Sequence, residues 1–551
     1  YLIFGRLFRY AGRIDAYVHK ITMRNDNPSD TEAVYLLARV EKLCGKPDSA
    51  YELYQAAAWQ YPWRSQSYFE IARIECMRGN REKAVQYLRR SLETNTKLFA
   101  ARTLLGYLLK DMATLKAVLD ETPQDTFARF ALYLLGGEKV SDFILNRPED
   151  VLDAALEFKE AGLYKEAVKT LDECKKPNQL LLFHRSAMTG QPAGSATMDY
   201  CFPNRLEDIP VLSGKNDWRA EYLLGCLYYD RLNYKAGAEA WEKSIQLNSQ
   251  NPYALRNLSF AYFDHLGKKK QALPLLEKAF SLDENNSRML YELLQLEKNL
   301  NFSVKDRLTL LESHQKLIKE RDDCYLDWVV LETQAGHYEK ACSLLKERRF
   351  NIYEGGEGKL TRQHTWLYTL IGIEAMKNGS LQKAEGAFQD ALVYPANYGE
   401  GRHYSAQEGN VWYFKGILME KLHRSDEARD CFEKAAGQPA QITGISCFAA
   451  KSLEKLQKPE EAKHLFQEMI DTAENRLRTA DLPGYFGVGL SAPLPFELDI
   501  EKKNKISAYL LLALAEKGLS KDSESTMAIN KLINLDPYNY ELNLFQRAGI
   551  L

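Results

Sequence analysis

A glycine-rich stretch, YEGGEGK at residues 353–359, contains two nearby glutamates, Glu354 and Glu357. Two carboxylates beside one another are the machinery of glycoside hydrolysis, in which they serve as general acid and as base or nucleophile. The flanking glycines let the backbone turn sharply, which would bring both side chains to one edge of a loop. The alternative is a pair of solvated glutamates, or glutamates that cap the following helix. Both interpretations stay open.

The same stretch resembles a phosphate-binding loop only superficially. In the motif G-x-x-x-x-G-K-[ST], Gly358 and Lys359 would require a glycine at position 353 and a Ser or Thr at 360. Those positions hold Tyr353 and Leu360. The segment GYFGVGL at 484–490 does not match G-x-G-x-x-G and follows no strand. Nucleotide binding is therefore excluded, and no cofactor is expected.

Histidines and cysteines give no metal site. His364 and His403 lie beside irregular segments, but no H-x-x-x-H pair supplies further ligands, so we expect surface or capping histidines. The nine cysteines include no C-x-x-C pair. A disulfide framework or zinc site is therefore not expected, and we expect the protein to reside in a reducing compartment.

Composition narrows the class of protein. The 551 residues are 45% hydrophobic and carry 73 Lys and Arg against 75 Asp and Glu, a net charge of −2. This balance argues against nucleic-acid binding and against a polybasic membrane-surface protein. No apolar run approaches the ~20 residues that span a bilayer. The chain begins at Tyr1 rather than Met, so we expect a piece of a longer protein.

A repeat explains most of the chain. Counting from residue 31, Gly45, Ala50, Tyr54, Ala57 and Pro62 occupy positions 15, 20, 24, 27 and 32, the spacing of a 34-residue tetratricopeptide repeat. Small residues at positions 8, 20 and 27 let two antiparallel helices approach closely, and large residues fill the groove between neighbouring hairpins. The glycine ends the first helix in a left-handed cap. The sequence predicts an all-α, right-handed solenoid of about ten to twelve such hairpins.

Irregular segments interrupt the array and suggest its organisation. We expect three parts: repeats at 1–147 with the last degenerate, a hairpin with an aromatic and Gly-Pro segment at 148–217, and a second array at 218–551. Insertions rich in Gly, aromatic and Arg or His residues lie at 349–364, 395–409 and 478–505. The helix predicted for 538–551 would cap the last hairpin.

First-helix positions that line the groove of such arrays are enriched in aromatic residues and arginine, which are typical interface anchors. The alternative is that these side chains pack between repeats. The candidate binding residues from these positions and from the insertions are Arg219, Tyr222, Tyr229, Tyr253, Arg256, Phe260, Trp366, Tyr413, Arg402 and Tyr485.

Several phrases are similar to one particular bacterial family: DYCFPNRLEDIPVL (199–212), RRFNIYEGGEGKLTRQH (348–364) and YFGVGLSAPLPFELD (485–499). In that family a galactose-mutarotase-like β-sandwich domain of unassigned function precedes a tetratricopeptide array. The resemblance covers roughly residues 150–540 and implies that the β-sandwich domain is absent from this chain. It also implies a bacterial, cytoplasmic protein and carbohydrate as the substrate class, by analogy alone.

Two functions follow from these observations. In the first, the array is a scaffold whose groove holds a protein or domain, most simply the missing β-sandwich domain. In the second, Glu354, Glu357, Arg402, His403 and Tyr485 contribute to a carbohydrate-active site shared with that domain. The scaffold is the function predicted for this chain.

Overall fold

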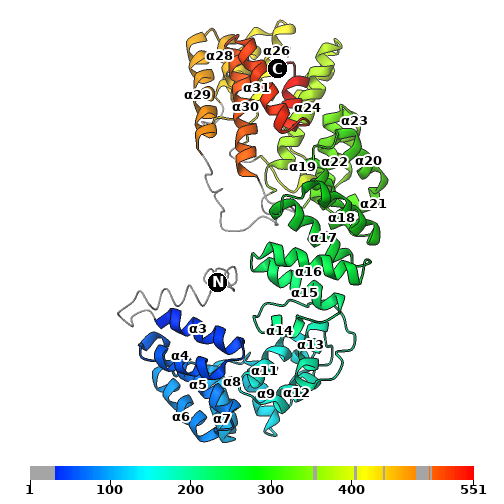
Figure 1. Cartoon of the computed structure of the whole chain (residues 1–551). Helices are drawn as coiled ribbons and strands as arrows, with labels where there is room; N and C mark the ends of the chain where they lie inside the picture. The colour runs from blue at the N-terminus through cyan, green and yellow to red at the C-terminus, as the bar shows by residue number, and fades with distance from the viewer. Residues whose placement is uncertain (1–30, 352–355, 403–405, 438–440, 480–495, 497–498) are drawn as a thin grey trace. The chain divides into compact units, whose positions relative to one another are not determined.

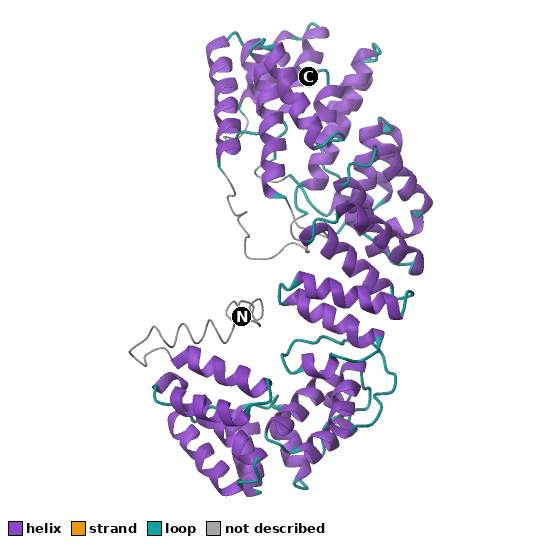
Figure 2. Cartoon of the chain, viewed as in Figure 1, coloured by secondary structure: helices purple, strands orange, loops and turns teal. Residues whose placement is uncertain are grey.

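The computed structural model describes residues 31–351, 356–402, 406–437, 441–479, 496 and 499–551. Within these ranges the regular elements are helices, accompanied by one isolated parallel bridge between Asn178 and Thr197 (Figure 2). The predicted all-α solenoid is confirmed. The chain divides into two compact units, Tyr1–Ala261 and Tyr262–Leu551. The three-part division expected from sequence stays a prediction.

The first unit is a succession of helical hairpins (Figure 1). Its helices are α3 (Thr31–Leu43), α4 (Pro47–Ala57), α5 (Tyr61–Met77), α6 (Arg81–Thr94), α7 (Phe99–Leu109), α8 (Met112–Glu121), α9 (Thr126–Leu134), α10 (Asp142–Leu145), α11 (Pro148–Glu160), α12 (Tyr164–Asp172), α13 (Gln179–Thr189), α14 (Asp208–Leu212), α15 (Trp218–Asp230), α16 (Tyr234–Leu247) and α17 (Pro252–Phe260).

The second unit begins within a π-helical turn and continues the hairpin pattern. Its elements are η1 (Ala261–His265), α18 (Lys269–Leu282), α19 (Ser287–Asn299), α20 (Val304–Ser313), α21 (Gln315–Ile318), α22 (Asp322–Ala335), α23 (Tyr338–Glu347), α24 (Lys359–Lys377), α25 (Leu381–Asp390), η2 (Ala396–Tyr398), α26 (Gly409–Lys421), α27 (Ser425–Ala436), α28 (Ser446–Lys455), α29 (Pro459–Arg478), α30 (Ile500–Gly518), α31 (Asp522–Leu535) and α32 (Tyr540–Arg547).

Local sequence accounts for the hairpins. Gly45 and Gly79 follow first helices with φ of 76° and 78°, the left-handed conformation that glycine adopts without strain. Gly416 on α26 lets the partner helix approach, because a Cβ there would lie 2.5 Å from Cε1 of Phe432 on α27. Small residues therefore set the close spacing within a hairpin, as the repeat predicts.

The interior of the first unit is crossed by ion pairs. Lys42 of α3 contacts Glu70 of α5 at 2.9 Å and Glu160 of α11 at 2.7 Å. Arg73 of α5 contacts Glu70 at 2.9 Å and also pairs with Glu157 of α11. Helices distant in sequence are thereby joined through buried charges.

The last helix makes unexpected contacts. Helix α32 packs against α22 and α24, near the mark C in Figure 1, and shares a pocket lining with α30 of the last hairpin. Its apolar residues Leu542, Leu544 and Phe545 are buried there. The expected cap stays a prediction, and the contacts with α22 and α24 are additional to it.

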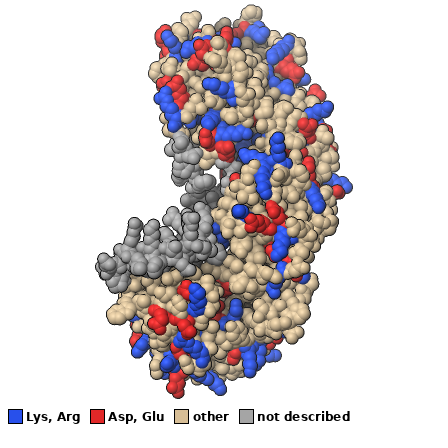
Figure 3. Space-filling view, viewed as in Figure 1, with Lys and Arg blue, Asp and Glu red and all other residues tan. Residues whose placement is uncertain are grey.

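On the face drawn in Figure 3, Lys and Arg alternate with Asp and Glu over both units, in line with the near-zero net charge. None of the helices in the described part of the chain combines the length and the apolar character needed to cross a bilayer.

Candidate functional site

Two of the insertions predicted from sequence, 349–364 and 395–409, are joined by hydrogen bonds. The backbone N–H of Phe350 donates to the carbonyl oxygen of Asn397 at 2.8 Å. The Asn397 side-chain amide donates in turn to the carbonyls of Leu345 at 2.9 Å and Arg348 at 2.7 Å. The described parts of segments 349–364 and 395–409 therefore form one structural feature beside the start of α24.

The turn at Gly358 and Lys359 binds the carboxylate of another residue of the same chain. The backbone N–H groups of Gly358 and Thr361, at the start of α24, donate to Glu400 Oε2 at 3.0 Å and Oε1 at 3.3 Å. Glu400 thus satisfies donors that a helix N-terminus leaves unpaired and complements the helix dipole. A capping glutamate does occur here, but it is Glu400 from the other insertion.

His364 is buried, so the expected surface position is wrong, whereas the expected capping contact is present at the last residue of α25, Asp390. Its ring is 1% exposed, with Nε2 at 2.9 Å from the carbonyl oxygen of Asp390 and Nδ1 at 2.8 Å from the Tyr398 hydroxyl. Because a carbonyl can only accept, Nε2 carries the proton and Nδ1 accepts from Tyr398. Burial lowers the pKa of His364, which keeps the ring neutral.

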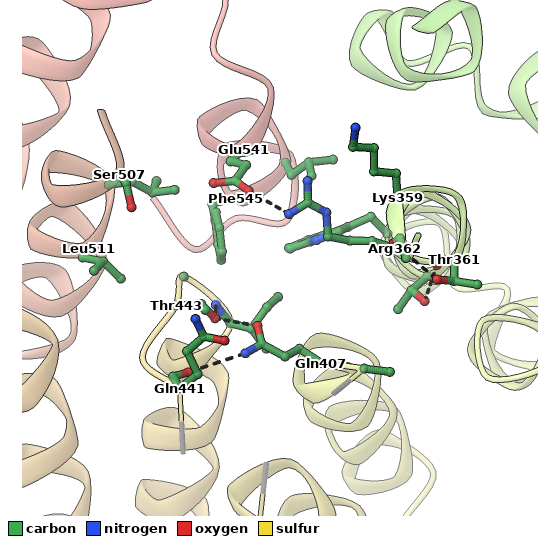
Figure 4. Close-up of a pocket in the computed structure, with 18 of the residues that line it drawn as sticks. Lys359, Thr361, Arg362, Gln407, Gln441, Thr443, Ser507, Leu511, Glu541 and Phe545 are labelled. Atoms are coloured by element: carbon green, nitrogen blue, oxygen red, sulfur yellow. Dashed lines mark hydrogen bonds and ion pairs between the residues drawn. The ribbon is translucent and has the colours of Figure 1, made fainter. Parts of the chain in front are cut away.

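A pocket of about 560 Å³ opens between α24, the segment before α28, helices α29 and α30, and α32 (Figure 4). The volume lies in the range of ligand and peptide side-chain sites. Its lining residues are Glu357, Gly358, Lys359, Thr361, Arg362, Thr365, Trp366, Tyr394, Ala406, Gln407, Gln441, Thr443, Gly444, Ile445, Arg476, Ser507, Leu510, Leu511, Glu541, Leu544 and Phe545.

One side of the pocket is apolar. The rings of Trp366 and Phe545 meet edge to face, with centroids 5.2 Å apart. Leu511 from α30 faces the same space as Phe545 (Figure 4). This surface can receive an aliphatic or aromatic side chain.

The other side offers hydrogen bonds. Thr443 Oγ1 donates to Gln407 Oε1 at 2.6 Å, and Arg362 lies 3.3 Å from the carboxylate of Glu541 (Figure 4). The Arg476 guanidinium donates to Ser507 Oγ at 2.5 Å and to the Ile442 carbonyl at 3.2 Å. Within the described ranges Arg476 forms no ion pair with a carboxylate. The pocket therefore combines an apolar wall with amide, hydroxyl and guanidinium groups.

The pocket lining includes two acidic side chains. Glu357 lines the pocket and is exposed, with Glu541 as the other carboxylate of the lining. Among the residues that the structure describes, no group of three or more His, Cys, Asp or Glu is placed to hold a metal ion. Glu354, His403 and Tyr485 lie outside the described residues, so the shared carbohydrate site stays a hypothesis.

Of the site residues predicted in the second unit, the binding candidate Trp366 and the catalytic candidate Glu357 both line this pocket. Tyr413 lies behind it, packed on Phe448 at a centroid distance of 5.6 Å. Arg402 is bound by Glu408 through bonds of 3.0 and 2.9 Å. Glu408 also accepts a bond of 2.7 Å from the pocket residue Tyr394.

The remaining predicted residues belong to the first unit. Arg219 donates to Asp217, Gln179 and Ser195, which ties the segment after α13 to α15. Tyr229 packs on Trp241 and Tyr234, and Arg256 lies over the ring of Phe260. Tyr222 is half-buried and Tyr253 is 50% exposed. These side chains do not share the pocket described above.

The sequence analysis missed the residues that α29, α30 and α32 contribute. Arg476, Leu511 and Phe545 lie in helices outside the insertions, where the sequence gives no local sign of a binding role. The insertions were the part of the sequence that gave a usable signal for this pocket, because they contain its lining residues Lys359 and Arg362.

The fold and the repeat spacing define a tetratricopeptide-type α-solenoid. No family model matches the chain. Among solved structures, the chain is similar to yeast Tom70, at 15% identity over 80% of this chain and 91% of that one with a TM-score of 0.25. It is also similar to a tetratricopeptide repeat protein of Parabacteroides merdae ATCC 43184, at 13% identity over 55% and 98% with a TM-score of 0.24, and to MamA, at 13% over 45% and 93% with a TM-score of 0.19.

Proposed function

We propose that this chain is a protein-interaction scaffold that holds a segment of a partner protein or domain in the pocket of its second unit. The observation that carries the proposal is the pocket itself: about 560 Å³, with an aromatic wall on one side and Thr443, Gln407 and Arg476 on the other. A mixed surface of this kind suits a polypeptide segment, whose side chains and backbone need apolar contact and hydrogen bonds together.

The partner that we propose is the carbohydrate-related β-sandwich domain of the family that the insertions resemble. Support comes from the position of those insertions. The segment RRFNIYEGGEGKLTRQH supplies Lys359 and Arg362 to the rim, so the most family-like part of the sequence borders the pocket. The carbohydrate connection is by analogy with that family.

The test is chemical cross-linking of the native protein in its own cells, followed by mass spectrometry of peptides joined to Lys359. A Gln441→Trp variant fills the pocket, and Gln467→Trp, on the exposed face of α29, is the matched control. We expect cross-links to a polypeptide outside residues 1–551, lost in the first variant and kept in the second. Cross-links unchanged by Gln441→Trp would remove the pocket from the function. Cross-links to a protein without a β-sandwich domain would remove the carbohydrate connection.

A further inference from the structure

Helix α32 is bound in the second unit much as a separate peptide would be. It contacts helices α22, α24 and α28, and the hydrogen bond from Gln334 Nε2 to the Tyr538 carbonyl, 2.7 Å long, joins residues 204 positions apart. An amphipathic helix seated in a groove between other helices is a recurring mode of peptide recognition. Here the helix is part of the same chain.

The first anchor is Tyr540, which is recognised through its hydroxyl. The hydroxyl donates to the side-chain oxygen of Gln363, and the Gln363 amide donates to Thr333 Oγ1 at 2.8 Å. The Thr333 hydroxyl in turn donates to the Val329 carbonyl at 2.8 Å, which completes this series of hydrogen bonds. The bond from the Gln363 amide to Thr333 does not involve α32, so it orients the Gln363 side chain independently of the tyrosine. A phenylalanine in place of Tyr540 would leave that buried oxygen without a donor.

The second anchor is Phe545. Its ring lies 5.2 Å from that of Trp366 and is stacked on Phe448 at 5.6 Å, measured between centroids. Gly444 faces this ring closely, since a Cβ there would lie 3.0 Å from it. The groove is therefore shaped for an aromatic side chain at this point.

The third contact is made at the end of a groove helix. Arg547 donates from Nη2 to the Gln334 carbonyl at 2.7 Å, in the last turn of α22, where carbonyls lack partners within the helix. A cation there also complements the helix dipole. Gly336 provides the space, because a Cβ would lie 2.8 Å from Nη1 of Arg547.

These contacts are compatible with release. Beside the rings of Trp366 and Phe448, the surfaces that face α32 carry Gln334, Arg362 and Gln363, which water can hydrogen-bond when the helix leaves. The helix is only 8 residues long, shorter than helices that persist alone in water, so it gains order by binding. Arg362 and Glu541 pair at its exposed edge, at 3.3 Å.

We propose that the groove formed by α22, α24 and the start of α28 is a helix-binding site, and that residues 538–551 occupy it as a built-in ligand. A partner segment that replaces it is an amphipathic helix with a tyrosine, a phenylalanine five positions later and an arginine two positions after that. The inference rests on the proposed function in one respect, since the displacing segment belongs to the partner, and on displacement its helix takes the place of α32 in the pocket wall. A short tether keeps the built-in helix at a high effective concentration, so it competes with any segment supplied from outside.

The test uses the full chain and a fluorescein-labelled synthetic peptide of residues 538–551. Phe545→Ala in the chain weakens the built-in helix, and Gln546→Ala, on its exposed face, is the control. In fluorescence polarisation we expect Phe545→Ala to raise peptide affinity at least about ten-fold over wild type, because the groove is more often open. Gln546→Ala should behave as wild type, and a peptide with Phe545→Ala should not bind. Equal binding of both peptides, or no gain in the Phe545→Ala chain, would overturn the proposal.

A second measurement on the wild-type chain covers the case in which Phe545→Ala does not fold. In hydrogen exchange, amides of α32 should exchange at least about a hundred-fold faster than those of α30, through local release. Equal protection of the two helices would show α32 to be a fixed element and refute the proposal. Neither readout involves the partner, so a failure of the cross-linking test leaves both interpretable.

Discussion

Replacement of Glu70 by glutamine should destabilise the first unit strongly and measurably. Glu70 is 6% exposed and accepts bonds from Lys42 and Arg73, both at 2.9 Å. Lys42 and Arg73 also reach Glu160 and Glu157 on α11, so the carboxylate lies at the centre of a network that joins α5 to α3 and, through its two cations, to α11. Glutamine keeps the shape of the side chain and removes the charge, which leaves two largely buried cations with less compensation.

Two arguments give the same magnitude. Burial alone would raise the pKa of Glu70, but the ion pairs with Lys42 and Arg73 outweigh it and lower the pKa from 4.5 to about 2. At about 1.4 kcal/mol for each pH unit, that difference is about 3 kcal/mol of folding free energy. Loss of one partner from a buried ion pair costs about 3–5 kcal/mol in other proteins. We therefore expect a loss of about 3 kcal/mol.

Hydrogen exchange at pH 6 measures this loss locally. The amides of α5 should exchange about a hundred-fold faster in Glu70→Gln than in wild type, while those of α30, in the other unit, stay unchanged as an internal control. Glu82→Gln, an exposed substitution on α6, should change exchange by no more than about two-fold. A change below about three-fold in Glu70→Gln would refute the assigned role of the ion network.

The pH dependence has a definite sign. Because the folded pKa of Glu70 lies below its unfolded value, the stabilisation is complete above pH 4.5 and is lost as the pH falls toward about 2. The stability difference between wild type and Glu70→Gln, from urea unfolding followed by circular dichroism, should shrink by more than half between pH 6 and about pH 3. A difference that grows on acidification would contradict the pKa assignment.

Two further substitutions test packing and titration. Gly416→Ala should cost about 1–3 kcal/mol in urea unfolding, because the new methyl group would collide with Phe432, whereas Gly386→Ala, an exposed helical site with nothing within 4 Å, should stabilise the chain by up to about 1 kcal/mol. Burial lowers the pKa of His184 despite its 2.7 Å bond to Asp208, so the unfolded chain takes up that proton first and stability should fall below pH 6.5. A His184→Gln variant should show a smaller fall, and an equal one would exclude His184 as its source.

The hairpins could be predicted because their causes are local. The glycine that ends a first helix, as at Gly79, and the small residue that faces a large one, as Gly416 faces Phe432, recur at fixed spacing and act within one repeat. The insertions were equally visible as breaks in that spacing. What each insertion contacts was not, because Glu400 and Gly358 are brought together only by folding.

The position of α32 could not be predicted for a related reason. Its sequence, YELNLFQR, is amphipathic and would suit either the end of the last hairpin or a groove elsewhere. Which of these two positions α32 takes depends on the small rotation that relates each hairpin to the next, added over all hairpins between α22 and α31. No short stretch of sequence determines this total rotation. The pocket depends on it too, since Glu541, Leu544 and Phe545 form part of its wall.

The inner faces of both units are filled in part by the chain itself, by ion pairs in the first and by a helix in the second. The difference matters for binding. Separating Lys42 or Arg73 from their carboxylates would leave buried charges unpaired. The free-energy cost of that separation is too high for a partner to replace these ion pairs readily. Release of α32 exposes amides and a guanidinium, which water can hydrogen-bond, and the apolar surface around Leu542, Leu544 and Phe545, which a partner helix can cover again. The second unit is therefore the one suited to exchange its own segment for that of another protein.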